Sequence, residues 1–176
     1  MPAMQQETTL HAAHLHYWIT GSEPEPGEAP RGAGQQRENG RAAVLEASEE
    51  HPGLVIRTGV QHGDIPALVR VHESEPELDA EGWDEIAQGD LHAVSYVQLS
   101  NLDGQLQELD LPWPGYGDES NWRVRLSVKG ADDSLSVAYA QDGHELTEQH
   151  RIDMWPAPEG GLRRLKEDAR SFRRPQ

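Results

Sequence analysis

The feature that most constrains this chain is the strict alternation of apolar and polar residues over residues 121–129. Its apolar members share one side of an extended chain: Trp122, Val124, Leu126 and Val128. A period of two places one face of a β-strand on a core and the other face in water. Turn-forming glycine, proline and aspartate residues flank the stretch on both sides. We therefore expect a central strand here, with Arg123 and Arg125 largely exposed.

Shorter stretches with similar patterning predict further strands, at 9–20, 54–60, 66–72, 84–94, 105–111 and 148–155. Many short strands separated by turns are typical of an all-β fold, and we predict a mostly antiparallel β-sandwich. The length of 176 residues fits a single domain over 1–176. The strands at 54–60 and 66–72 are expected to form a hairpin across 61–64.

Two segments depart from the strand pattern. Residues 21–41 contain no aromatic or branched aliphatic residue, which predicts a flexible insert that is dispensable for folding, with residues 42–47 returning to the sheet. Residues 162–172 carry apolar residues at helical spacing, which predicts a short C-terminal helix within a basic tail at 162–174. That tail either docks on the acidic body or reaches a partner.

The charge balance is strongly acidic, with 31 Asp and Glu against 15 Lys and Arg and a formal net charge of -16. Such a field repels nucleic acid and anionic membranes and attracts basic proteins. Solubility alone is the simpler explanation of the same composition. We therefore expect no nucleic-acid or membrane partner, and a basic protein partner if the acidic surface is functional.

Cysteine is absent, which excludes disulfides and thiol chemistry. The N-terminus lacks the pattern of a signal peptide, and no apolar run is long enough to span a membrane, so we expect a cytoplasmic protein. No cofactor is expected. His14 and His16 share one face of a predicted strand and could ligate zinc, although half-exposed strand histidines explain them more simply.

Residues 72–90 form the most unusual segment, because they contain eight acidic residues and no lysine or arginine. Pro76 and Gly82 disfavour a continuous helix, so an extended acidic connection is expected. Trp83 is either an apolar anchor for a partner or a plug at the end of the sandwich. The candidate partner-binding residues are Glu73, Glu75, Glu77, Asp79, Glu81, Trp83, Asp84 and Glu85.

Several features together resemble a known group of proteins. They are a Val-x-Val-x strand, an acidic linker that leads to Trp-Asp-Glu at 83–85, Trp-Arg-Val-Arg-Leu-x-Val-x-Gly at 122–130 and Ile-x-x-Trp-Pro at 152–156. The pattern covers roughly residues 54–158. It is similar to small uncharacterised bacterial β-sandwich proteins, which are distantly similar to the competence nuclease inhibitor. The resemblance implies a binding protein of inhibitor or immunity type.

We therefore expect a non-catalytic acidic binding protein that acts on a basic protein such as a nuclease. A nuclease site holds phosphates and is basic, so an acidic surface can occupy it. The alternative is a ligand- or carbohydrate-binding module that uses Trp113, Tyr116 and Trp122, with calcium ligands conceivable at 118–119 or 132–133. No catalytic motif is present, so no enzyme is expected.

Overall fold

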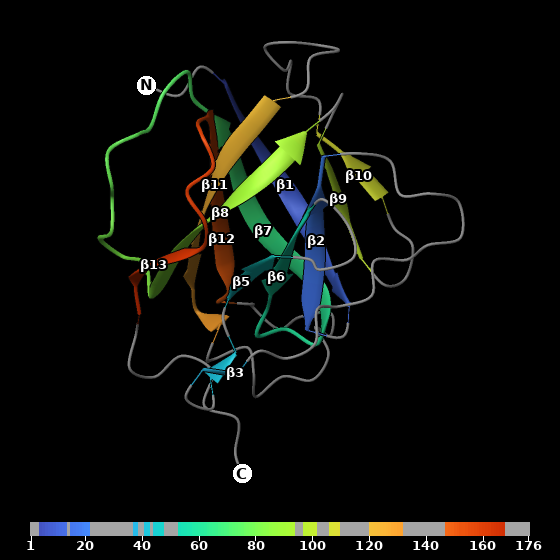
Figure 1. The fold of residues 1–176 in the computed structure, drawn as a ribbon. Coiled ribbons are helices and arrows are strands. Elements are labelled where there is room, and N and C mark those ends of the chain that lie inside the picture. Colours follow the sequence, from blue (N-terminus) through green and yellow to red (C-terminus); the bar gives the residue numbers. More distant parts are fainter. Residues whose placement is uncertain are drawn as a thin grey trace.

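The computed structural model describes residues 4–13, 15–21, 37–38, 41–42, 44–47, 53–93, 97–101, 106–109, 120–131 and 147–167. Every regular element named in these ranges is a strand (Figure 1). The elements are β1 (Met4–Ala13), β2 (His16–Thr20), β3 (Arg37–Glu38), β4 (Arg41–Ala42), β5 (Leu45–Ala47), β6 (Gly53–Arg57), β7 (His62–Val71), β8 (Glu85–Ala93), β9 (Gln98–Ser100), β10 (Leu106–Glu108), β11 (Ser120–Lys129), β12 (Gln149–Pro156) and β13 (Arg163–Lys166).

Eleven of these strands form one sheet in the order β10-β9-β2-β1-β7-β12-β11-β8-β13, with β6 paired to both β2 and β5 beside this path. All described pairs are antiparallel except that of β7 with β12. β3 and β4 form a separate two-stranded ribbon. The expected all-β, mostly antiparallel class is therefore confirmed.

The sheet curls on itself. Leu15 has a φ of 69° and breaks the strand expected over 9–20 into β1 and β2, which share only the Ala13–His16 pair. Beyond this bend β2, β6 and β5 lie back against β8. Because hydrogen bonding continues around the bend, the described residues form a curled half-barrel, and the expected sandwich of two separate sheets is not confirmed among them.

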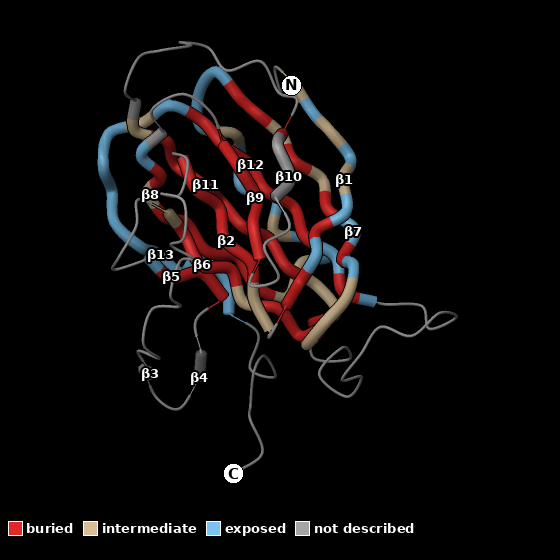
Figure 2. Tube along the Cα trace, turned by 90° about the vertical axis from the view of Figure 1, so that its right-hand side faces the viewer, coloured by how far each residue is buried: buried red, intermediate tan, exposed pale blue. Residues whose placement is uncertain are grey.

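β11 lies between β12 and β8 and supplies much of the core. Its four apolar side chains, Trp122, Val124, Leu126 and Val128, are at most 2% exposed, as the alternation predicted. Buried residues of β2, β6, β9, β11 and β12 gather at the centre of Figure 2, while β1 and β7 alternate between buried and exposed positions at the margin.

The expected hairpin of 54–60 with 66–72 is wrong. β6 pairs with β2 and β5, and β7 pairs with β1 and β12. The turn between them is real, but the two strands separate across the curl. β7 pairs with two strands that are longer than β6, and β6 pairs with strands on the other side of the curl, because local turn chemistry does not determine which strands pair.

The expected C-terminal helix is also wrong for its described part, because Arg163–Lys166 forms β13 and extends the sheet beyond β8. An open strand edge offers unpaired backbone groups, and pairing with them overrides a weak helical pattern. Residues 168–174 of the predicted helix lie outside the described residues. So does the 21–41 insert, apart from Gly21, Arg37–Glu38 and Arg41, whereas the predicted return to the sheet is confirmed by β5.

Candidate functional site

The most unusual feature of the molecule is the segment 72–84 between β7 and β8, hereafter the acidic strap. It is extended and makes a wide arc outside the strands at one side of the sheet in Figure 1. Five of its acidic residues are exposed: Glu73, Glu75, Glu77, Asp79 and Glu81. Pro76 and the left-handed Gly82, with a φ of 76°, keep it from forming a helix, as expected from the sequence.

The strap covers a sheet face that carries arginines. Arg123, Arg125 and Arg151 project from β11 and β12 on the side opposite the apolar core, and they are only 5%, 2% and 6% exposed. The expectation that Arg123 and Arg125 face water is therefore wrong. The alternation correctly placed both side chains on the face of β11 opposite the core. That face is nevertheless buried, because the strap and the segment after β12 cover it as a second layer.

Arg125 holds the middle of the strap. Its Nη1 donates to the carbonyl oxygens of Pro76 at 3.0 Å and Glu77 at 3.2 Å, and its Nη2 donates to Glu75 Oε1 at 3.0 Å. The guanidinium also lies 4.9 Å from the centre of the Trp155 ring. Burial lowers the pKa of Arg125, and the Glu75 carboxylate partly opposes that shift. Arginine stays charged in proteins because its intrinsic pKa is so high.

Arg151 holds the second half of the strap. Its Nη1 donates to Asp79 Oδ2 at 2.9 Å, and its Nη2 donates to the Asp79 carbonyl at 2.8 Å. These contacts lower the pKa of the Asp79 carboxyl. The same guanidinium lies 4.7 Å from the centre of the Trp83 ring, and Lys129 Nζ lies 5.3 Å from it. Trp83 is half-buried beneath two cations, which stabilises the end of the strap.

Both ends of the strap are fixed to neighbouring strands. At its start, Asp153 accepts hydrogen bonds from Arg70 at 2.6 and 2.9 Å and contacts His72 Nε2 at 2.8 Å. Burial raises the pKa of the Asp153 carboxyl, but the hydrogen bonds from Arg70 and His72 outweigh burial and the net shift is downward. At its end, Asp84 Oδ2 accepts from the Gly130 backbone N–H at 2.8 Å.

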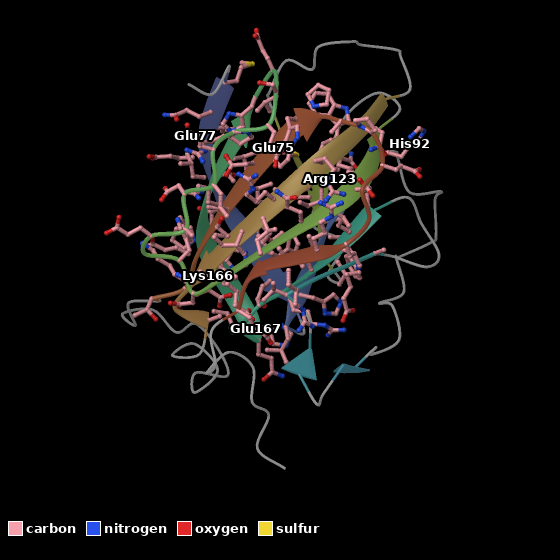
Figure 3. The ribbon with its side chains drawn as sticks, turned by 60° about the vertical axis from the view of Figure 1, so that its left-hand side comes forward. Glu75, Glu77, His92, Arg123, Lys166 and Glu167 are labelled. Atoms are coloured by element: carbon pink, nitrogen blue, oxygen red, sulfur yellow. The ribbon has the colours of Figure 1, made fainter. Side chains whose placement is uncertain are left out.

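A second covering segment follows β12. Asp90 accepts from Arg123 Nη1 at 2.6 Å and from the backbone N–H groups of Gly160 and Gly161, the shortest at 2.7 Å. Burial raises the pKa of Asp90, but these donors outweigh it and lower the pKa. Lys166 Nζ donates to the Ala80 carbonyl at 3.0 Å, which joins β13 to the strap. Figure 3 labels Arg123 on the covered face, with Glu75 and Glu77 on the strap and Lys166 on β13.

The structure divides the eight candidate residues into two groups. Glu73, Glu75, Glu77, Asp79 and Glu81 lie together on the exposed strap. Trp83 is half-buried, Asp84 bonds the turn after β11, and Glu85 is buried within β8 at 9% exposure. Glu75 and Asp79 are paired with arginines, whereas Glu73, Glu77 and Glu81 have no ion pair among the residues that the structure describes. These three carboxylates carry the exposed charge of the strap that no ion pair in the described residues neutralises.

A chain of hydrogen-bonded, buried polar side chains was not predicted from the sequence. Glu148 accepts hydrogen bonds from the backbone N–H groups of Gly59 and Val60 at 2.9–3.0 Å and contacts His150 Nε2 at 2.8 Å, while His150 Nδ1 contacts the Tyr17 hydroxyl at 2.8 Å. All three side chains are at most 1% exposed. Burial and the nearby Glu148 charge raise the pKa of Tyr17. No spacing rule connects residues so far apart in the chain, and their inaccessibility is typical of a structural network.

The structure adds no support to the carbohydrate, calcium and zinc sites that the sequence suggested. Trp122 is 2% exposed and cannot stack on a sugar, while Trp113, Tyr116 and the suggested calcium ligands lie outside the described residues, as does His14. No group of three potential metal-ligating side chains is found in the described part of the chain.

No helix in the described ranges is long and apolar enough to cross a membrane.

The fold of this chain, a curled all-β sheet, is similar to that of two solved structures. One is ComJ from Bacillus subtilis, an inhibitor of the DNA degrading activity of NucA, with 12% identity, a TM-score of 0.54, and coverage of 88% of this chain and 100% of ComJ. The other is crocagin biosynthetic gene J, with 15% identity, a TM-score of 0.51, and coverage of 88% and 98%. No family model and no curated protein matches the sequence. At these identities the likeness concerns the fold, and it confirms the distant similarity to the competence nuclease inhibitor.

Proposed function

We propose that this protein is a non-catalytic, inhibitor-type binding protein whose acidic strap occupies a basic site on a protein partner such as a nuclease. The observation that carries the proposal is the strap itself: it is exposed, bears Glu73, Glu77 and Glu81 without ion pairs in the described residues, and is fixed in place by buried arginines. The fold shared with ComJ supports the same function.

Electrostatic attraction is the proposed basis of binding. Carboxylates that project from a fixed backbone resemble the regularly spaced phosphates that a nuclease binds, and a strongly acidic body attracts a basic partner over long range. The chain's net charge of -16 strengthens this attraction and disfavours nucleic acid itself as the ligand. In this proposal the strap binds the partner's basic site and excludes the partner's substrate from it. No chemical reaction by this protein is required.

The direct test measures degradation of DNA by purified NucA while this protein is titrated in. We expect inhibition that weakens as salt rises, because exposed charges are screened beyond about 8 Å at physiological ionic strength. Failure to inhibit NucA or to bind it by calorimetry would contradict the nuclease assignment.

Matched charge variants locate the binding face. Glu77→Gln with Glu81→Gln removes two charges from the strap, whereas Glu7→Gln with Glu159→Gln removes two exposed charges elsewhere. Because both proteins have the same net charge, only local placement differs. We expect the strap variant to associate with NucA several-fold more slowly and the control to associate nearly as fast as the wild type. Equal rates would show that the strap is a solvated connection.

A further inference from the structure

Three large apolar side chains are exposed on the described surface. One lies on the strap, one directly before β13 and one within β13. They are Leu78 at 49%, Leu162 at 50% and Leu165 at 37%. A single exposed leucine is ordinary in a soluble protein. Leu78 differs from the other two in its surroundings, because it lies between Glu77 and Asp79 in the middle of the acidic strap.

The backbone around Leu78 is fixed at four points. Arg125 binds the carbonyl oxygens of Pro76 and Glu77, Arg151 binds that of Asp79 and Lys166 binds that of Ala80, at 2.8–3.2 Å. The carbonyls on both sides of Leu78 are thus turned to cations of the protein body, while the Leu78 side chain remains half exposed. A leucine presented on such a fixed segment loses little further conformational freedom when a partner covers it.

The charges around Leu78 indicate what can cover it. Arg125 and Arg151 neutralise Glu75 and Asp79 within the protein, while Glu77 has no ion pair in the described residues. A partner surface that buries Leu78 must therefore also contact the negatively charged carboxylate of Glu77 beside it. An apolar pocket bordered by lysine or arginine meets both requirements, whereas a polyanion meets neither.

We infer that Leu78 is the apolar anchor of the interface, and that the partner protein receives it in an apolar pocket bordered by lysine or arginine. The inference rests on the proposed function, since it names the contact by which the strap would bind. Apolar anchors near the centre of an interface carry a large share of binding energy, while surrounding charges mainly set the association rate. Leu78 would therefore govern how slowly the complex dissociates.

The test compares two leucine-to-serine variants against purified NucA. Leu78→Ser removes the anchor, and Leu162→Ser removes an equally exposed leucine outside the strap. We expect Leu78→Ser to raise the inhibition constant at least tenfold through faster dissociation, with an unchanged thermal unfolding midpoint. Leu162→Ser should change the constant less than twofold.

Three outcomes would overturn the inference. Leu78→Ser that inhibits like the wild type would show that the leucine makes no important contact, although the proposed function would stand. A wild-type homodimer in sedimentation velocity that Leu78→Ser dissociates would show that a second copy covers the leucine. A wild-type protein that leaves NucA fully active would remove the proposed function and this anchor together.

Discussion

At the scale of single residues, the buried arginines connect the sheet to its covering layer. Arg125 donates to three oxygens of the strap, and Arg151 donates to two oxygens of Asp79. A guanidinium has five N–H donors and no acceptor, so it suits a layer built from carbonyls and carboxylates. The arginines thereby fix an acidic segment that would otherwise repel itself.

We expect Arg125→Ala to destabilise the protein by about 2–3 kcal/mol, because it removes a buried side chain and the donors to three oxygens of the strap. Leu126→Ala, on the core side of the same strand, should cost about 2–5 kcal/mol through cavity formation. Urea denaturation of both variants gives the comparison. A negligible effect of Arg125→Ala would mean that the strap detaches freely and contributes nothing to folding.

Asp153 predicts a pH dependence. Its pKa is lowered in the folded protein, and an unfolded aspartate titrates at about 3.9. The unfolded chain therefore takes up the proton more readily, so the stabilisation from Asp153 is present above about pH 4 and is lost as the pH falls through the lower folded pKa. Asp153→Asn should lower stability at neutral pH and flatten its decline in acid, measured by urea midpoints across pH. If the stability of Asp153→Asn fell as steeply in acid as that of the wild type, the prediction would be contradicted.

At the scale of elements, the two covering segments support each other. Lys166 of β13 binds Ala80 of the strap, and Asp90 of β8 binds Gly160, Gly161 and Arg123. β13 itself has four residues, all exposed, and such a short edge strand has little stability of its own. Its position depends on Asp90 and on pairing with β8.

We expect Asp90→Ala to free the segment 157–166 without unfolding the sheet. Amide hydrogen exchange of β13 should accelerate strongly, whereas exchange in β11 should stay slow, because local opening requires less free energy than global unfolding. Asp64→Ala, which removes an exposed carboxylate from β7, is the control. Unchanged protection of β13 after Asp90→Ala would show that strand pairing alone holds it.

At the scale of the whole molecule, the curled sheet is joined across its interior by the Tyr17–His150–Glu148 chain. Tyr17 belongs to β2, His150 to β12, and Glu148 also binds the backbone at Gly59 and Val60 after β6. Buried polar groups are costly unless they are fully bonded, so this chain favours one arrangement of the curl over others.

Removing the centre of this chain should be severe. Glu148→Ala leaves two backbone donors and the Nε2 atom of His150 without a partner in the interior, and we expect a loss of about 3–5 kcal/mol. Tyr17→Phe removes only the terminal hydroxyl and should cost about 1 kcal/mol. Thermal and urea unfolding measure both. Equal losses would indicate that packing of the Tyr17 ring, rather than the polar chain, dominates.

The sequence by itself determined the local features of this protein. The period of two placed β11 and its buried residues, and the acidic, proline-containing composition of 72–84 determined an extended strap, because both properties depend on neighbours along the chain. Only the tertiary structure decided which strands pair, that residues 163–166 extend the sheet, and that Arg123 and Arg125 are buried. Those outcomes depend on groups such as Asp90, Pro76 and Glu77, which lie 33–49 residues away in the sequence and meet the arginines only after the sheet has formed.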